Sequence, residues 1–462
     1  MADPVLDLAG TKRIHVANVG GAGMSAIAVL LAEMGHTVTG HDPADDTPFL
    51  SALRDHGISV ATGTPPPLGA VDAVVVSTAT PADHPQLIEA RRAGTPVLHR
   101  SAALAALCRD RRTLVVAGTH GKTTTTALLA TILTEAAQRP GYVVGAEVAG
   151  LGRNATWGGG GPLVVEGDES DGTFLALGGH SAIVTNVEAD HLEHWGGVAR
   201  LVAAFEQFVA DLPGPAVLCL DDPGSAALVR HAVQPVTYGT AADADYRIAD
   251  ITTEGTGVAF VLHHAGEQVA VTVPAAPGEH NARNAAAALA LAHRSGVALA
   301  AGAAALATFR GVARRFELRG EVAGITLVDS YDHLPTEVVA ALSAARAGGW
   351  RRVVCTFQPH RYSRTEALGS SFADAFTEAD LLIITDVYAA GEAPRPGVTG
   401  KLVVDAVLDA HPRAHVAWLP TLDDVVAYLG THLRPGDLCL TLGAGDLTSV
   451  PDRLVPVLRA RR

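Results

Sequence analysis

The sequence predicts an α/β protein of three domains, each built around a mostly parallel β-sheet. A chain of 462 residues has room for about three domains of roughly 150 residues each. Apolar, β-branched runs alternate with helix-compatible segments along the chain, and polar clusters follow the ends of these runs. Ligands of open parallel sheets bind at the carboxyl ends of the strands, so we expect the functional residues in these clusters. The predicted domains are 1–110, 111–313 and 314–462.

Composition argues against several other classes of protein. Hydrophobic residues make up 48% of the chain, only 5% are aromatic and 48 are glycine, which is typical of an Ala/Val/Leu/Gly-rich α/β protein. The net charge of -14 argues against a nucleic-acid-binding surface, and no apolar run is long enough to span a membrane. The four cysteines are far apart, which favours free thiols in a reducing compartment. We therefore predict a cytoplasmic protein, monomeric or weakly dimeric, without nucleic-acid or membrane partners.

The first domain opens with a strand, a glycine-rich turn and a helix. Residues 13–19 are predicted to form the strand, and the helix runs through Leu31. A second strand at 36–40 leads to Asp42, about twenty residues after the glycines, as in dinucleotide-type folds that hold a pyrophosphate at the helix start. Such a turn often serves packing alone. The candidate substrate-binding residues are Asp42 and the turn Gly20, Gly21, Ala22, Gly23, Met24 and Ser25.

The second domain begins with a phosphate-binding pattern centred on Lys122. This residue is one of only three lysines in a chain that otherwise uses arginine. It lies between a β-branched run and a helix-compatible segment, where glycine amides, a helix N-terminus and a lysine can cradle phosphates. The loop has two residues between its glycines instead of the usual four, and a glycine turn with an exposed lysine is the alternative. The candidate nucleotide-binding residues are Gly118, Thr119, His120, Gly121, Lys122, Thr123 and Thr124.

Two acidic segments follow later strands of this domain. Glu166 comes directly after the strand at 163–165, and His191 follows the strand at 182–187. We expect both to face a Mg²⁺ ion held by the hydroxyl of Thr123. Three other carboxylates are expected in solvated loops, namely Glu169, Glu188 and Glu193. Asn281 and Asn284 precede a long alanine-rich helix, where they can read an adenine edge or simply cap the helix.

The third domain repeats the pattern of strands that end in polar clusters. Its predicted strands are 325–328, 352–357, 381–385 and 438–442. These strands predict a second doubly wound sheet and an active site between domains.

Nine sequence boxes, in this order along nearly the whole chain, resemble the ATP-dependent Mur ligases. They are GTHGKTTTT, EGDESDG, TNVEADHLEHWGG, PGEHNARNA, RRFELRGE, DSYDHLPTE, FQPHRYSRT, DVYAAGE and GAGD. The GGAGMS turn and the FQPHRYSRT box are most similar to the family members that join L-alanine to UDP-N-acetylmuramate. The resemblance implies a Rossmann-like domain for the UDP-sugar, a P-loop ATPase-like domain for ATP and Mg²⁺, and a Rossmann-like domain for the amino acid. It also implies reaction through an acyl phosphate in peptidoglycan precursor synthesis.

The resemblance assigns roles to residues of this chain. Lys122 is expected to hold the β- and γ-phosphates, Thr123 and Glu166 one Mg²⁺, and His191 a metal at the γ-phosphate. Asn281 and Asn284 are expected to read adenine, and Asp329 the ribose. Domain closure is expected to bring in Arg314 or Arg315. The residues expected around the amino acid are Tyr331, His333, His360, Arg361 and Arg364.

Three positions depart from the family pattern, and they leave the substrates open. Asn18 replaces a glycine of the first loop, which asparagine can do because it tolerates unusual backbone angles. Asp332 and Leu334 replace an alanine and a histidine beside the expected acceptor pocket, so either L-alanine or a different acceptor remains open, as does a different donor. A nucleotide-binding regulator would need only the phosphate loop, and a NAD(P)-dependent oxidoreductase would leave that loop unexplained.

Overall fold

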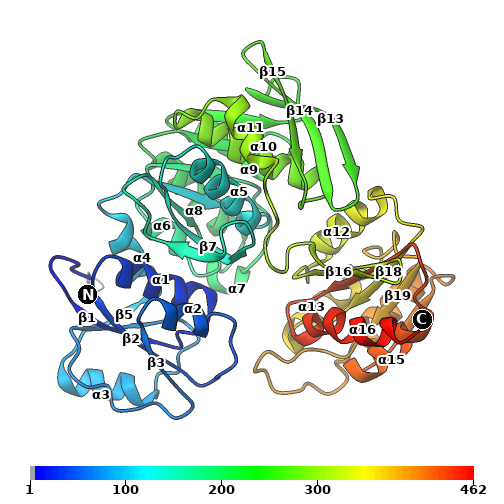
Figure 1. Ribbon diagram of the computed structural model, residues 1–462, viewed down its shortest axis with the longest axis horizontal. Coiled ribbons are helices and arrows are strands. Elements are labelled where there is room, and N and C mark those ends of the chain that lie inside the picture. Colours follow the sequence, from blue (N-terminus) through cyan, green and yellow to red (C-terminus); the bar gives the residue numbers. More distant parts are fainter. Residues whose placement is uncertain (1–5, 462) are drawn as a thin grey trace. The chain divides into compact units, whose positions relative to one another are not determined.

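The structure, a computed structural model, describes residues 6–461 and contains three β-sheets (Figure 1). The chain divides into two compact units, and each is described by itself. The first unit contains the residues up to Ala249, with Leu262–Val269 and Arg283–Leu306. The second contains Asp250–Val261, Ala270–Ala282 and the chain from Ala307 onward. The sheets confirm the predicted α/β class.

The N-terminal sheet is fully parallel, with the strand order β3-β2-β1-β4-β5. Its strands are β1 (Arg13–Ala17), β2 (Thr37–Asp42), β3 (Ser59–Thr62), β4 (Ala73–Val76) and β5 (Val97–His99). Its helices are α1 (Ala22–Glu33), α2 (Leu50–Asp55), α3 (Pro85–Ala93) and α4 (Arg100–Cys108). Alternate residues of β1 face opposite sides, because Ile14 and Val16 enter the core with α1 while His15 bonds Gln86 of α3.

The central sheet of the first unit follows the order β12-β11-β10-β6-β9-β7-β8. Only β8 runs antiparallel to its neighbour, β7, within this stretch. The strands are β6 (Thr113–Ala117), β7 (Gly141–Val148), β8 (Arg153–Thr156), β9 (Leu163–Glu166), β10 (Ser181–Val184), β11 (Ala216–Cys219) and β12 (Pro235–Gly239). Helices of this part are α5 (Lys122–Glu135), α6 (Thr173–Ala176), α7 (Leu192–Trp195), α8 (Val198–Ala210), α9 (Pro223–Ala227) and α11 (Leu299–Leu306).

The boundary between the two units falls within four elements of the chain. These are β13 (Tyr246–Glu254), β14 (Gly257–His264), β15 (Glu267–Val273) and α10 (Glu279–Arg294). Asn281 and Asn284 of α10 therefore belong to different units.

The sheet of the second unit has the order β16-β17-β21-β18-β19-β20, and only β16 is antiparallel to its neighbour. Its strands are β16 (Glu317–Val322), β17 (Ile325–Ser330), β18 (Arg352–Phe357), β19 (Leu381–Ile384), β20 (Val416–Trp418) and β21 (Asp437–Leu442). Its helices are α12 (Pro335–Ala347), α13 (Tyr362–Leu368), α14 (Lys401–Ala410), α15 (Leu422–His432) and α16 (Val450–Arg459). Separate apolar cores on the two faces, one with α12 and α14 and one with α15 and α16, make this a doubly wound sheet.

Strand ends differ from the prediction where a polar residue continues a strand. Asp42, Glu166 and Asp329 were expected after their strands, but they are part of β2, β9 and β17. A strand extends as far as its hydrogen-bond ladder does, even beyond its last apolar residue, because backbone groups form the ladder. No helix among residues 6–461 is long and apolar enough to cross a membrane.

Candidate active site

The phosphate-type loop connects β6 to α5 and depends on two glycines. Gly118 has φ +130° and Gly121 has φ +79°, both in the region that favours glycine. A Cβ at Gly118 would lie 2.1 Å from Oγ1 of Thr185, and one at Gly121 would lie 2.7 Å from Oδ1 of Asn284. No side chain caps α5 at Gly121, so its first amides remain directed at the loop.

Residues after β10 fix the shape of this loop. The amide of His120 donates to Oδ1 of Asn186 at 2.7 Å, and Oγ1 of Thr185 donates to the carbonyl of His120 at 2.6 Å. Sequence reasoning missed both partners. Their position directly after a strand beside β6 was the available signal, because parallel neighbours end at the same edge.

The ammonium group of Lys122 is held inside the loop. Nζ donates to the carbonyl of Gly118 at 2.7 Å and to that of Thr119 at 2.9 Å. It also contacts the carboxylate of Glu169, at 2.9 Å and 2.7 Å from the two oxygens. The side chain is only 14% exposed, so the alternative of an exposed lysine on a glycine turn is wrong.

Glu169 corrects the prediction of a solvated loop. Its side chain is 2% exposed, and burial raises its carboxyl pKa although the Lys122 ammonium opposes the shift. The indole of Trp195 donates to its carbonyl at 3.0 Å. A buried carboxylate needs a partner, and the lysine that provides it lies 47 positions away in sequence. Glu188, by contrast, is 43% exposed, as expected.

We expect Glu169→Gln to lower the thermal unfolding midpoint of the nucleotide-free protein by about 2–6 °C, because it leaves a buried ammonium without its counter-charge. A non-hydrolysable ATP analogue should reduce this deficit, since phosphates would supply the missing negative charge. Glu188→Gln is the matched control and should shift the midpoint by less than about 1 °C. Equal shifts for both variants, measured by differential scanning fluorimetry, would show that the Lys122 contact contributes no stability.

Thr123 and Glu166 present two oxygens beside the lysine. Oγ1 of Thr123 donates to Oε1 of Glu166 at 2.8 Å, and the amide of Gly145 donates to Oε2 at 2.7 Å. A hydroxyl and a carboxylate next to a phosphate-binding loop suit Mg²⁺, which takes few protein oxygens and completes its shell with phosphates and water. The residues present therefore fit this ion, and the side chains that the structure describes include no cluster of three or more His, Cys, Asp or Glu that could hold a metal.

His191 stands at the edge of the same site with an unusual backbone. Its φ is +51°, and it precedes the short helix α7. Nε2 lies 4.0 Å from Oε1 of Glu169 and 3.4 Å from Oδ2 of Asp190. The structure thus brings His191 to the Lys122–Glu169 pair, and strain of about 1–3 kcal/mol at a non-glycine residue is typical of functional sites.

Arg100 ties the acidic loop to the N-terminal part of the unit, and sequence reasoning missed it. Nη2 donates to Oδ2 of Asp168 at 2.6 Å and to Oδ2 of Asp171 at 2.7 Å. The arginine begins α4 and the aspartates flank Glu169, so one loop carries partners for both cations.

A glycine turn lies between β1 and α1, as predicted, but α1 already begins at Ala22, so the predicted turn residues 22–25 belong to the helix. The amide of Gly20 donates to Oδ2 of Asp42 at 2.7 Å, and Asp42 is 7% exposed, so this acid supports the turn itself. Met24 and Ser25 are buried within α1. Asn18 has φ +54°, which confirms that asparagine accepts the backbone of the glycine it replaces.

Two predicted adenine readers occupy separate environments. Asn284 is 7% exposed and lies against Gly121 of the phosphate-type loop. Asn281 is 6% exposed and donates from Nδ2 to the carbonyl of Pro277 at 2.8 Å.

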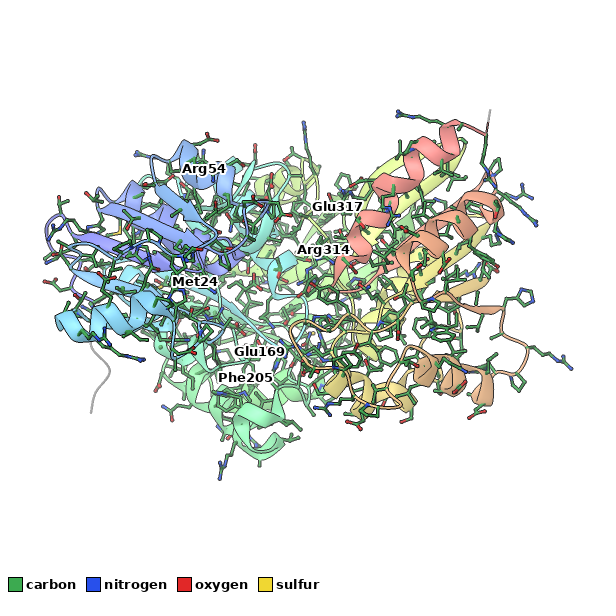
Figure 2. The ribbon with its side chains drawn as sticks, turned by 90° about the horizontal axis from the view of Figure 1, so that it is seen from below. Met24, Arg54, Glu169, Phe205, Arg314 and Glu317 are labelled. Carbon is green, nitrogen blue, oxygen red and sulfur yellow. The ribbon has the colours of Figure 1, made fainter. Side chains whose placement is uncertain are left out.

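In the second unit, the partly buried Arg314 pairs with the buried Asp329 (Figure 2 labels Arg314). Asp329 is 1% exposed and accepts hydrogen bonds from the hydroxyls of Thr441 and Thr448, each at 2.6 Å. Nε of Arg314 lies 3.5 Å from Asp329, and Nη2 donates to the carbonyl of Gly443 at 2.6 Å. Both carboxylate oxygens of Asp329, which is predicted to bind the ribose, thus already accept hydrogen bonds from within the protein.

A cluster of rings collects the predicted acceptor residues. The ring of His333 lies 5.6 Å from that of His360 and meets Tyr331 edge-on, with centroids 5.4 Å apart. His360 stacks on Tyr388, and Nη1 of Arg364 lies 3.3 Å from its Nδ1. Burial, together with His333 and the nearby arginines, lowers the pKa of His360 to about 4. Both rings are therefore neutral at pH 7, since burial also lowers the pKa of His333.

Asp332 and Leu334, the two departures, are engaged in local structure. The hydroxyl of Ser330 donates to Oδ2 of Asp332 at 2.7 Å and accepts from the amide of Phe316 at 3.0 Å. Leu334 is 8% exposed and precedes α12.

Three models of one family match successive parts of the chain. The description "Mur ligase family, catalytic domain" matches residues 13–112, "Mur ligase middle domain" matches 163–292, and "Mur ligase, glutamate ligase domain" matches 314–445.

Relatives and solved structures agree with these models along the full length. A UDP-N-acetylmuramate--L-alanine ligase of Kineococcus radiotolerans is 46% identical over 460 residues, covering 97% of both chains. One of Thermobifida fusca is 41% identical and covers 96% of both. The crystal structure of a UDP-N-acetylmuramate-alanine ligase from Thermotoga maritima has a TM-score of 0.83 at 27% identity, covering 98% of this chain and 100% of that one.

Proposed function

This chain belongs to the Mur ligase family, and from that premise we propose that it joins L-alanine to UDP-N-acetylmuramate with ATP, releasing ADP and phosphate. The reaction supplies peptidoglycan precursors. Sequence identity of 41–46% over nearly the whole chain to ligases of that name carries the proposal for the substrates. For the phosphate chemistry, the proposal rests on Lys122, whose ammonium is held by the loop, and on the hydroxyl–carboxylate pair of Thr123 and Glu166. Four buried, unpaired cysteines favour the cytoplasm as the compartment.

The donor carboxylate attacks the γ-phosphorus of ATP, and the bond to the bridging oxygen of ADP breaks. This gives an acyl phosphate, whose carbon the uncharged amine of L-alanine then attacks. The tetrahedral intermediate expels phosphate, which carries away one oxygen of the original carboxylate, and the amine loses a proton. Such transfers depend mainly on positioning and on stabilising negative charge.

The residues of the phosphate-type loop supply these effects. The amides at the start of α5 bind phosphate oxygens. Lys122 gives up some of its contacts within the loop and binds the γ-phosphate instead. Thr123 and Glu166 would hold Mg²⁺, and His191 is proposed as a ligand of a second ion. When bound, the ions would neutralise phosphate charge.

We propose that the ring cluster of the second unit receives the amino acid. His333 and His360 are uncharged there, and Arg364 provides a planar cation suited to a carboxylate. Arg361 directly precedes α13 beside this cluster.

The function is tested by product mass after incubation with ATP, UDP-N-acetylmuramate and a panel of amino acids. We expect sustained ADP release only when donor and acceptor are both present, and a product one alanyl residue heavier than the donor. ADP release without a new mass, or with no dependence on the donor, would refute the proposal and favour a nucleotide-binding regulator.

Asp332 and Leu334 are not expected to redirect the acceptor preference. One Asp332 oxygen is bonded to Ser330 and Leu334 is buried, so the double change Asp332→Ala with Leu334→His should keep kcat/KM for L-alanine within about threefold. L-Alanine should remain ahead of glycine, since one methyl group is worth about 1–3 kcal/mol. A gain in L-alanine turnover above tenfold, measured by coupled ADP release, would mean that the natural chain serves another acceptor.

A further inference from the structure

We propose that Arg100 binds the diphosphate of the UDP-sugar donor and so belongs to the substrate-binding machinery. The identity of the donor rests on the proposed function. The position of the arginine rests on contacts within the first unit alone.

The guanidinium group of Arg100 faces two neighbours, the acidic loop and the start of α1. Nε and Nη2 bond the acidic loop, with Nε 3.2 Å and Nη2 2.7 Å from Oδ2 of Asp171 and Nη2 2.6 Å from Oδ2 of Asp168. Nη1 donates no hydrogen bond to any residue of the described chain, 6–461. It points instead at the first turn of α1, because a Cβ built on Gly23 would lie 3.7 Å from it.

The glycine turn leaves room for an anion next to Gly21. A Cβ at Gly20 would collide with Oγ1 of Thr47 at 2.7 Å and Oδ2 of Asp42 at 2.8 Å, so that side of the turn is filled. Next to Gly21 nothing lies within 4 Å of such a Cβ. Gly21 precedes α1 without a side-chain cap, so the first amides of the helix remain available.

A purely structural contact between the acidic loop and the N-terminal part of the unit would not need an arginine whose Nη1 is left without a hydrogen bond within the described chain. Arg153 of β8 shows such a tie, since it bonds Glu33 of α1 at 3.3 Å and is 45% exposed. Arg100 is 26% exposed and keeps one donor pair directed at the first turn of α1, two residues beyond the open space at Gly21. Arg100 also holds the loop that carries Glu169. The same loop therefore contacts both the proposed donor-binding arginine and Lys122.

Calorimetry without ATP tests this inference directly, with UDP, UDP-N-acetylglucosamine and UDP-N-acetylmuramate as ligands. Arg100→Gln should lower the affinity for all three ligands by about 10- to 100-fold, because it removes a charged hydrogen bond to a phosphate. Arg100→Lys keeps the charge and should recover part of the loss. Arg153→Gln, the matched control, should bind all three ligands as the parent does.

A second variant separates binding from scaffolding. Asp171→Asn weakens the tie and leaves the arginine in place, so it should lower affinity far less than Arg100→Gln does. Equal losses in these two variants, or affinities of Arg100→Gln within threefold of the parent, would overturn the inference. A loss confined to UDP-N-acetylmuramate would overturn it too, since the arginine would then read the carboxylate. Failure of the parent to bind any of the three would refute the proposed function itself.

Discussion

Lys122→Ala should lower ligation by at least about a thousandfold, since it removes the cation that we propose binds the transferred phosphate. An uncompensated phosphoryl charge in a site that excludes water costs several kcal/mol, and each 1.4 kcal/mol is a factor of ten in rate. The ammonium is 14% exposed and is already fixed by the carbonyls of Gly118 and Thr119, so water has little access to replace it. Steady-state ADP release with saturating donor and L-alanine measures the effect.

Two further variants keep this result interpretable. Lys401→Ala changes a lysine at the start of α14, in the other unit, and should leave turnover unchanged. The alanine variant also leaves Glu169 buried without its cation, so the double variant Lys122→Met with Glu169→Gln should regain stability but remain inactive. Turnover within tenfold of the parent in either Lys122 variant would remove the lysine from the mechanism.

Glu166→Ala should raise the Mg²⁺ concentration for half-maximal activity by at least tenfold and slow turnover about a hundredfold. It deletes the carboxylate that we propose as a hard oxygen ligand of Mg²⁺, which lies 2.8 Å from the hydroxyl of Thr123. Glu147→Ala on the same neighbouring strand, β7, as Gly145 is the control, because that carboxylate is exposed. An unchanged Mg²⁺ titration for Glu166→Ala would mean that the carboxylate only fixes the amide of Gly145.

Local sequence predicted the elements whose cause is local. The run from Arg352 to Phe357 is β-branched and apolar and forms β18 over those residues, and the loop glycines take the positive φ angles that their positions require. The helix at α5 begins at Lys122 because Gly121 can adopt the left-handed conformation.

Long-range contacts account for what the sequence could not predict. The burial of Glu169 depends on Lys122, and the side chain of Arg100 is held by aspartates 68 and 71 positions away. Periodicity carries no information on such pairs. The internal partners of Asp329 come from a strand and a 3₁₀ helix more than 100 positions later, so the sequence could not show that both of its oxygens accept hydrogen bonds within the protein.

The most direct test of the central claim follows oxygen from donor to phosphate. UDP-N-acetylmuramate labelled with ¹⁸O in its carboxylate is incubated with the protein, ATP, Mg²⁺ and L-alanine, and the phosphate released is analysed by mass spectrometry. An acyl phosphate requires one labelled oxygen in each phosphate, because the carboxylate oxygen leaves with it. Unlabelled phosphate released together with ADP would contradict the account, since ATP would then be hydrolysed without activating the donor.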